Sequence, residues 1–320
     1  MDHITRKNFE AREDTGDIEN EPDEEEDDYL YDGSENFYGQ LASFMNFTEK
    51  YCNKPCRNGA IHTRCKYQFP SDEYDQVIDV LGSHMRDIIL NEHNSVRNNF
   101  ANGYWTDITG TKYSVLQKTN LPLAANMREM QWNEELATSA RMWTRQCKAT
   151  SDLCRDAYLS EGSDVLTYVS QLIDAINWTG GQDGIPTAQT SFSKWYKEYP
   201  HFTADNISPY KKPRNPQTYY GSIAQIIWAD SYLLGCATAM CRNNESTSSL
   251  IITACNYGPG EMVEGRNVYV KGGPCTRCKL LNRTTLGGSY CSSEFPNLCS
   301  GTGLASTQLA MLALMSIIFV

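Results

Sequence analysis

Residues 233–256 read LLGCATAMCRNNESTSSLIITACN, and this stretch decides the fold. Its two ends, Leu233–Met240 and Ser249–Asn256, have the pattern of β-strands, and a polar segment joins them. The arrangement predicts an antiparallel hairpin. Helical patterns lie on its N-terminal side, so we expect an α+β chain in which helices cover the strands in α-β-α layers.

Four helices are expected before the hairpin. The first follows apolar residues at a period of about 3.6 residues from Val77 to Phe100, and Gly103 ends it. The second starts at Asn133, a good N-cap that two glutamates follow. The third follows Pro186. The expected helices cover approximately residues 77–100, 133–147, 187–199 and 219–228.

The chain contains twelve cysteines. Cytosolic proteins rarely carry so many thiols unless they bind metal, so the count predicts an oxidising, extracellular compartment. An even number allows every cysteine to pair. The spacing Cys275-x-x-Cys278 is also typical of zinc ligands, so a zinc site is the alternative for the last four cysteines.

Acidic residues are concentrated near the start of the chain. Glu10–Asp28 holds twelve acids and one arginine, which account for the whole formal net charge of −11. The segment is almost without apolar residues, so we expect residues 1–50 to be disordered. Sulfation of Tyr29 and Tyr31 is an alternative to a plain solvated arm. The rest of the chain has no basic excess, so no binding of nucleic acid is expected.

The two ends of the chain bear on export. Met1–Phe9 lacks the apolar stretch of a signal peptide. Leu309–Val320 is apolar but too short to span a bilayer as a helix. Because small and polar residues precede it, residues 300–320 are expected to be a lipid-anchor signal attached at Ser300, with an uncleaved hydrophobic tail as the alternative. Sequons predict glycosylation at Asn46, Asn177, Asn206, Asn244 and Asn282.

Three ordered blocks lie in and beside the hairpin: Gln225–Asp230 (QIIWAD), Leu234–Ala237 (LGCA) and Ala254–Gly260 (ACNYGPG). They resemble signature blocks of the CAP superfamily, which unites cysteine-rich secretory proteins, insect venom allergens and plant pathogenesis-related proteins. Further similar segments are Glu92-His93-Asn94 with Arg97, Met130–Ala137, Gln146-Cys147, and Cys154-Arg155-Asp156.

The resemblance implies an architecture. Residues 51–265 would form a three-layer α-β-α sandwich, the CAP or SCP domain, and residues 266–299 a small disulfide-rich hinge. The early loop with Tyr51-Cys52 and His62–Cys65 is similar to the insect venom-allergen branch in particular. The implied disulfides are Cys52–Cys65, Cys56–Cys154, Cys147–Cys241, Cys236–Cys255, Cys275–Cys291 and Cys278–Cys299. The fourth agrees with the hairpin prediction, which places its two cysteines on paired strands.

Many members of the superfamily keep a central cleft with two histidines and two acids that hold a divalent metal. The matching positions here are Ser151, Ser163, Glu198 and Ser222, with Glu161 or Asp164 as alternatives near the second. Hydroxyls and one carboxylate make a poor zinc site, because no imidazole contributes. We therefore expect no metal, no cofactor and no catalytic residue.

The expected function is a secreted or surface-attached binding protein for a lipid, a sterol or an extracellular protein. A secreted hydrolase acting through Glu198 and Ser222 or Ser151 is the alternative, and an adhesive surface protein is a third reading. Glu198 is interpreted as a solvated charge beside its helix, and His93 as a satisfied core histidine. Four aromatic residues either line a binding surface or belong to the core: Tyr196, Tyr199, Phe202 and Tyr210.

Overall fold

Strands β6 (Leu233–Arg242) and β7 (Ser249–Gly258) pair antiparallel at the centre of the sheet, which confirms the predicted hairpin. The computed structural model describes residues 50–56, 58–106, 116–159, 166–180, 184–260, 262–278 and 291–300. Within them the strand order is β1-β6-β7-β5, and β4 pairs parallel with β6. The other bounds are Gln76–Asp79 for β1, Gln131–Trp132 for β4 and Ser170–Trp178 for β5.

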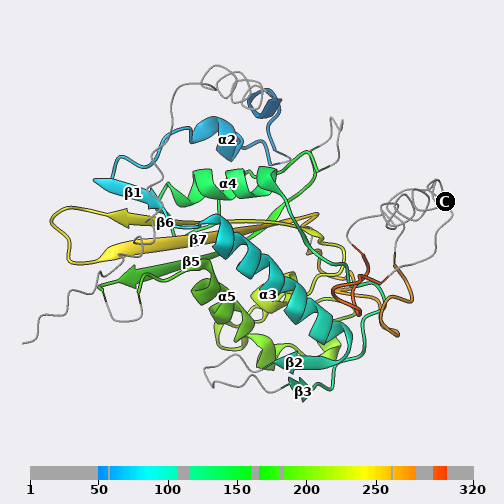
Figure 1. Ribbon diagram of the computed structural model, residues 1–320. Coiled ribbons are helices and arrows are strands. Elements are labelled where there is room, and N and C mark those ends of the chain that lie inside the picture. The colour runs from blue at the N-terminus through cyan, green and yellow to red at the C-terminus, as the bar shows by residue number, and fades with distance from the viewer. Residues whose placement is uncertain are drawn as a thin grey trace, which may run out of the picture. The chain divides into compact units, whose positions relative to one another are not determined.

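Helices cover both faces of this sheet, as Figure 1 shows. One layer holds α2 (Thr63–Lys66) and α4 (Glu134–Thr144). The other holds α3 (Ser83–Ala101), α5 (Ala188–Tyr196) and α6 (Gly221–Ile226). The arrangement confirms the expected three-layer α-β-α sandwich. A two-stranded ribbon of β2 (Tyr104–Thr106) and β3 (Leu116–Lys118) lies beyond the end of α3.

The first expected helix starts later than the periodicity predicts. Val77 lies on β1, where it is the register partner of Cys241 on β6, so its assignment to a helix is wrong. Pairing with the edge of the sheet supplies hydrogen bonds that an isolated first turn could not, and α3 begins only at Ser83. Gly103 has a φ of 74°, a left-handed conformation that favours glycine and suits the end of a helix.

Helix α4 begins as its sequence predicts. The Oδ1 of Asn133 accepts a hydrogen bond of 2.9 Å from the backbone N–H of Leu136. Where α4 crosses β6, a Cβ at position 235 would collide with the backbone of Leu136 and Ala137, so Gly235 permits this close approach. The helix is therefore held directly against the central strand.

The remaining expected helices are shorter than predicted. Helix α5 ends at Tyr196, and Tyr199 starts a separate 3-10 turn, Tyr199–His201. Helix α6 occupies only the middle of the expected 219–228 segment. Strand β5, which was not anticipated, pairs with β7 along its whole length and forms one edge of the sheet.

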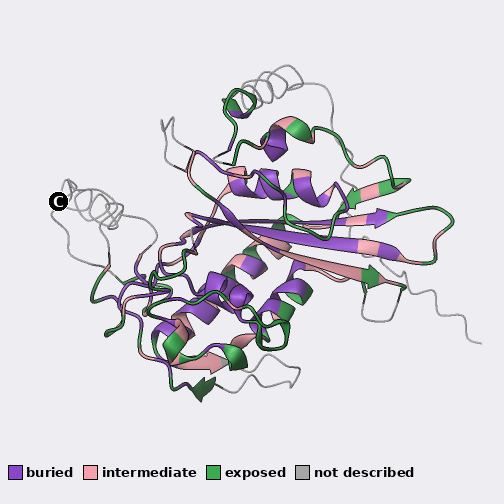
Figure 2. Ribbon diagram, turned by 180° about the vertical axis from the view of Figure 1, so that it is seen from behind, coloured by how far each residue is buried: buried purple, intermediate pink, exposed green. Residues whose placement is uncertain are grey.

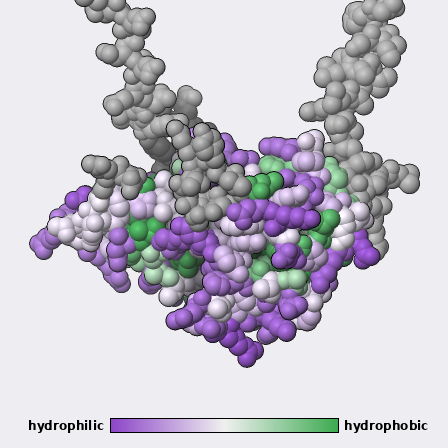
Figure 3. Space-filling model, turned by 90° about the horizontal axis from the view of Figure 1, so that it is seen from below, coloured by the Kyte–Doolittle hydropathy of each residue, from purple (hydrophilic) through white to green (hydrophobic). Residues whose placement is uncertain are grey.

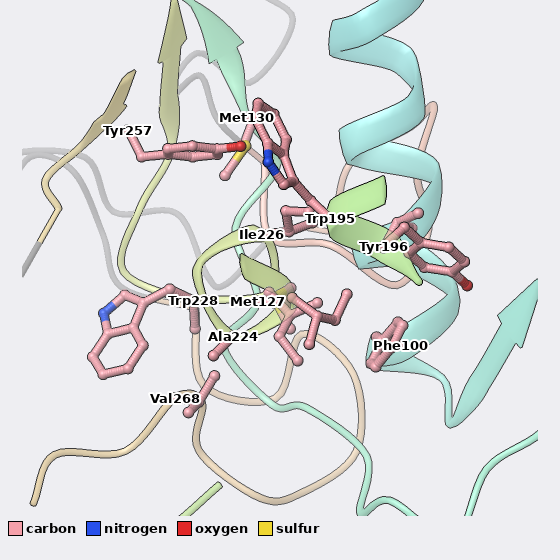
Figure 4. Close-up of a cluster of buried hydrophobic side chains, with 14 of the residues drawn as sticks. Phe100, Met127, Met130, Trp195, Tyr196, Ala224, Ile226, Trp228, Tyr257 and Val268 are labelled. Carbon is pink, nitrogen blue, oxygen red and sulfur yellow. The ribbon is translucent and has the colours of Figure 1, made fainter. Parts of the chain in front are cut away.

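The largest core lies between the sheet and the layer of α3, α5 and α6. Figure 2 shows the buried inner faces of these elements, and Figure 4 shows large apolar side chains meeting there from helices, strands and loops. Two smaller clusters pack on the α4 side: Leu136, Ala157, Val169 and Leu233, and then Ala140, Ala237 and Ala254.

The described part of the cysteine-rich segment shares the main core. Val268, Tyr269 and Leu298 are almost fully buried in it, and the N–H of Cys299 donates to the carbonyl of Met127 at 2.7 Å. The segment is therefore anchored to the sandwich; the domain limits proposed above stay predictions. Six disulfides join the pairs implied by the resemblance: Cys52–Cys65, Cys56–Cys154, Cys147–Cys241, Cys236–Cys255, Cys275–Cys291 and Cys278–Cys299.

None of the described helices has both the length and the apolar character needed to cross a membrane. Seen from below in Figure 3, the surface carries apolar patches that hydrophilic side chains separate. Residues 301–320, including the apolar tail, lie outside the described residues.

Candidate functional site

The carboxylate of Glu198 lies against the start of helix α6. Its Oε2 accepts hydrogen bonds from the backbone N–H of Ser222 at 2.8 Å and of Ile223 at 3.4 Å. Its Oε1 accepts from the Ser222 hydroxyl at 2.7 Å. Two of the four cleft positions therefore meet. The interpretation of Glu198 as a solvated charge is wrong, because α6 packs beside α5 and supplies three donors.

The surroundings of Glu198 act on its charge in opposite directions. Burial raises the pKa of the Glu198 carboxyl above its usual range, while the hydrogen bonds from Ser222 and Ile223 and the charge of nearby His201 lower it. Burial has the larger effect. Glu198 in turn raises the pKa of Tyr219, together with burial of that phenol.

This geometry is that of a helix cap. Backbone N–H groups at the start of a helix lack partners within the helix, and a carboxylate there satisfies them. The bond from Ser222 to Glu198 also has the reach required of a nucleophile and its base. However, Ser222 is only 6% exposed. In the described part of the chain, no hydrogen bond joins a histidine to either side chain.

The other two cleft positions do not join this pair. Ser151 is exposed in the loop between Cys147 and Cys154, and the contacts recorded for Glu198 and Ser222 do not include it. Ser163 lies outside the described residues, as do Glu161 and Asp164. Among residues that the structure describes, no three His, Cys, Asp or Glu side chains come together as a metal site would require.

An open pocket of about 670 Å³ lies beside Glu198. Cationic side chains, Tyr219 and two prolines line it. The cations come from the end of α5 and the loop before α6. They are Lys194, Lys197 and Arg214, and the side chain of His201 lines the pocket with them. Sequence reasoning missed this set because folding brings Arg214, from the loop before α6, beside the residues at the end of α5.

A second pocket of about 440 Å³ has a more apolar lining. Leu153, Tyr168 and Val263 line it, and they are 74%, 39% and 41% exposed, respectively. Met262 adds a fourth apolar side chain, and Lys212 and Asp156 add charged groups of opposite sign. Leu153 lies two residues after Ser151, in the loop where the family's first cleft histidine would stand. No periodicity marks these residues, because they come from separate loops.

Four aromatic residues were expected either to line a binding surface or to belong to the core, and the structure places them mainly in the core. Tyr196, Phe202 and Tyr210 are 2–4% exposed and lie in the main cluster, and Tyr199 packs against it. Tyr210 still borders the apolar pocket. The accessible apolar surface at that pocket therefore comes from large exposed apolar side chains and not from the aromatic face of α5.

Three of the five sequon asparagines are described. Asn177 and Asn244 are exposed, whereas Asn206 is half-buried and its Nδ2 donates to the Tyr220 hydroxyl at 2.9 Å. Asn46 and Asn282 lie outside the described residues. Ser300, the expected anchor position, is half-buried at the end of the described chain.

Comparison with known proteins shows which family this chain is similar to. The family model described as "CAP: Cysteine-rich secretory protein family" matches residues 90–257. Venom allergen 3 of Solenopsis invicta is 30% identical over 243 residues, which cover 74% of this chain and 93% of that protein. The CRISP/Allergen/PR-1 protein of Trittame loki is 30% identical over 254 residues. The match covers 77% of this chain but only 55% of the length of that protein.

One solved structure that aligns with this chain is the hookworm platelet inhibitor. The alignment covers 72% of this chain and 97% of the inhibitor chain, at 20% sequence identity and a TM-score of 0.45. The family assignment rests on the sequence matches. Complete pairing of all twelve cysteines fits an extracellular protein, since disulfides persist in oxidising compartments. The chain belongs to the CAP family of cysteine-rich secretory proteins, in its venom-allergen-like branch.

Proposed function

We propose that the protein is a secreted, non-catalytic binding protein whose apolar pocket takes a lipid or sterol ligand. The observation that carries the proposal is the state of the cleft. Glu198, the one cleft acid retained among the described positions, accepts three hydrogen bonds from the start of α6 and holds a helix in place. An acid used as a cap is not available to a substrate in the same geometry.

The second pocket supports the choice of ligand. Leu153 is 74% exposed there, and burying an apolar side chain of this size stabilises a complex by about 1.5–3 kcal/mol. Exposed apolar residues that gather at one concave site mark binding surfaces. The neighbouring Lys212 suits a ligand with an apolar body and one acidic or hydroxyl group. An extracellular protein that inserts an apolar side chain is the other expected partner.

Binding of cholesterol and of palmitate to the full-length protein tests the proposal. We expect saturable binding that Leu153→Ser weakens by roughly tenfold, the loss of most of one buried side chain. Phe69→Ser is the matched control, because Phe69 is 80% exposed in another loop and lines none of the pockets described here. Absence of saturable binding, or equal binding by both variants, would overturn the lipid assignment.

A hydrolase is the second candidate, and one observation favours it. The Ser222 hydroxyl donates to Glu198 at 2.7 Å, a distance at which a carboxylate can take up a proton. We expect no turnover of broad ester and peptide substrates by the wild-type protein. Turnover that disappears in both Ser222→Ala and Glu198→Gln would replace the binding proposal with an enzymatic one.

Surface attachment is a separate proposal. If residues 300–320 direct lipid attachment at Ser300, a phospholipase that cuts lipid anchors should release the protein from cells. Mass spectrometry of the released protein should then end at Ser300. A soluble mature product that retains the apolar tail would contradict attachment without affecting the ligand proposal.

A further inference from the structure

The pocket beside Glu198 concentrates positive charge from lysine and arginine side chains. Lys194 and Lys197 are followed by His201 at intervals of three and four residues, so the three side chains lie on one side of α5 and the turn after it. All three are exposed. Arg214, from the loop before α6, lines the same pocket, and the exposed Lys212 lies two residues before it.

Nearby acids neutralise only part of this charge. The Nζ of Lys194 lies 2.9 Å from Asp174, and Arg214 lies 3.8 Å from Glu264 with its side chain 85% exposed. An ion pair as exposed to solvent as this one contributes little to stability, so Arg214 remains available to a ligand. No ion pair is recorded for Lys197 within the described residues. Glu198, the acid in the lining, already accepts three hydrogen bonds.

The lining also offers flat apolar surfaces. Tyr219 is 43% exposed, and its ring lies against Gly221, where a Cβ would collide with the Tyr219 hydroxyl. Pro213 and Pro216 line the same pocket. The C–H faces of sugar rings pack well on such surfaces, because both partners are apolar there while hydroxyl and acidic groups point outward.

We propose that this pocket binds a sulfated, carboxylated polysaccharide. Cations from two segments of chain require a ligand with several separated anionic groups, and such a sugar polymer carries them in an extracellular setting. An extended peptide is less suitable, because peptides are commonly held at a strand edge and no strand residue lines the pocket. Single-stranded nucleic acid is usually held by several stacked aromatic side chains, and this pocket has one.

Heparin is the probe for the test. The full-length protein should be retained on immobilised heparin and released by NaCl, since binding to a polyanion weakens as salt rises. Lys197→Ala/Arg214→Ala should lower the elution salt and weaken binding roughly tenfold. Lys118→Ala/Arg242→Ala is the control: both side chains are exposed outside this pocket, and the double variant has the same net charge. Every variant keeps the acidic segment 10–28, so its repulsion is constant.

Three results would overturn the proposal: equal elution of the two double variants, equal retention on desulfated heparin, or tighter retention on single-stranded DNA than on heparin. The test is independent of the proposed lipid pocket. Leu153→Ser should keep its heparin elution, and Lys197→Ala/Arg214→Ala should keep its cholesterol binding. Loss of both activities in either variant would point to misfolding, which thermal unfolding of the same samples detects and which would withdraw the assignment to this pocket.

Discussion

His93 and Tyr257 join helix α3 to strand β7 through a hydrogen bond of 2.8 Å between Nε2 and the phenol oxygen. The other ring nitrogen, Nδ1, lies 2.7 Å from the carbonyl of Ile89. A carbonyl only accepts, so Nδ1 carries the proton and Nε2 accepts from Tyr257. The ring is fully buried with both nitrogens satisfied, which confirms its interpretation as a core histidine.

Tyr257→Phe should destabilise the fold while keeping its shape. The change removes one hydroxyl and leaves the buried Nε2 of His93 without a donor, which costs about 1–3 kcal/mol. Guanidinium unfolding with intact disulfides would measure the loss. Tyr168→Phe is the control, because Tyr168 is 39% exposed and its hydroxyl has no hydrogen-bond partner among the described residues. An unchanged unfolding midpoint for Tyr257→Phe would contradict the assigned tautomer.

Acidification below pH 6.5 should destabilise the protein. Burial lowers the pKa of His62 to about 4 and of His93 to about 3, so the folded state holds both neutral while the unfolded state takes up protons. Stability is therefore complete above about pH 6.5 and falls as the pH approaches these lowered values. At pH 5 each histidine should lower the free energy of unfolding by about 2 kcal/mol.

Unfolding free energies at pH 7.5, 6 and 5 check this dependence. Burial also raises the pKa of Glu92, Glu135 and Glu198. Protonation of these acids on acidification therefore stabilises the folded protein and opposes the effect of the histidines. We expect the histidines to dominate, since both are completely buried. A stability that stays constant or rises from pH 7.5 to pH 5 would show that the carboxyls prevail.

Arg97 holds the end of α6 against α3 through backbone carbonyls alone. It is fully buried, and burial lowers its pKa to about 9. Its guanidinium donates at 2.7–3.0 Å to four carbonyl oxygens, those of Arg128, Ile226, Trp228 and Ser231.

Arg97→Met should cost more than about 3 kcal/mol, because four buried carbonyls lose their donor together. Arg145→Met is the matched control. Arg145 forms an ion pair with Asp79 at the surface, where such pairs contribute about 0–1 kcal/mol. Thermal unfolding of both variants would compare the losses. Similar losses in the two proteins would mean that the carbonyls find water as a replacement.

Glu198→Ala should loosen the start of α6. The variant removes the acceptor of three hydrogen bonds, and loss of such a cap costs about 1–2 kcal/mol. Glu264→Ala, which removes an open pair with Arg214 and an exposed hydrogen bond of 3.3 Å from the Lys212 N–H, should cost less, under about 1 kcal/mol. Hydrogen exchange of the Ser222 and Ile223 amides would locate the effect. Unchanged exchange at both amides would refute the capping role.

Among the described sequons, we expect glycans at the exposed asparagines and none at the half-buried one. Asn177 and Asn244 are exposed and should carry glycans. Asn206 should not, since its Oδ1 accepts from the N–H and hydroxyl of Thr203 at 2.8 Å and its Nδ2 donates to Tyr220. Glycopeptide mass spectrometry of the secreted protein would decide. A glycan on Asn206 would require this network to open.

Local patterns predicted the elements whose cause is local. Asn133 caps α4 through a residue three positions away, and two β-rich runs joined by a polar segment marked β6 and β7. The periodicity failed at Val77, where pairing with Cys241, far along the chain, outweighed the helical spacing. Strand β5 went unnoticed for the same reason, because β7 is what holds it in the sheet.

The sequence alone was sufficient for the family and the implied cysteine pairs, because blocks of ordered residues carry that information; the assignment of the four cleft positions stays a prediction. The tertiary structure alone decided how Glu198 is used, since Ser222 is 24 residues away and reaches it only when α5 and α6 pack together. The apolar pocket at Leu153 and the cationic pocket at Lys197 arise in the same way, from loops that folding brings side by side.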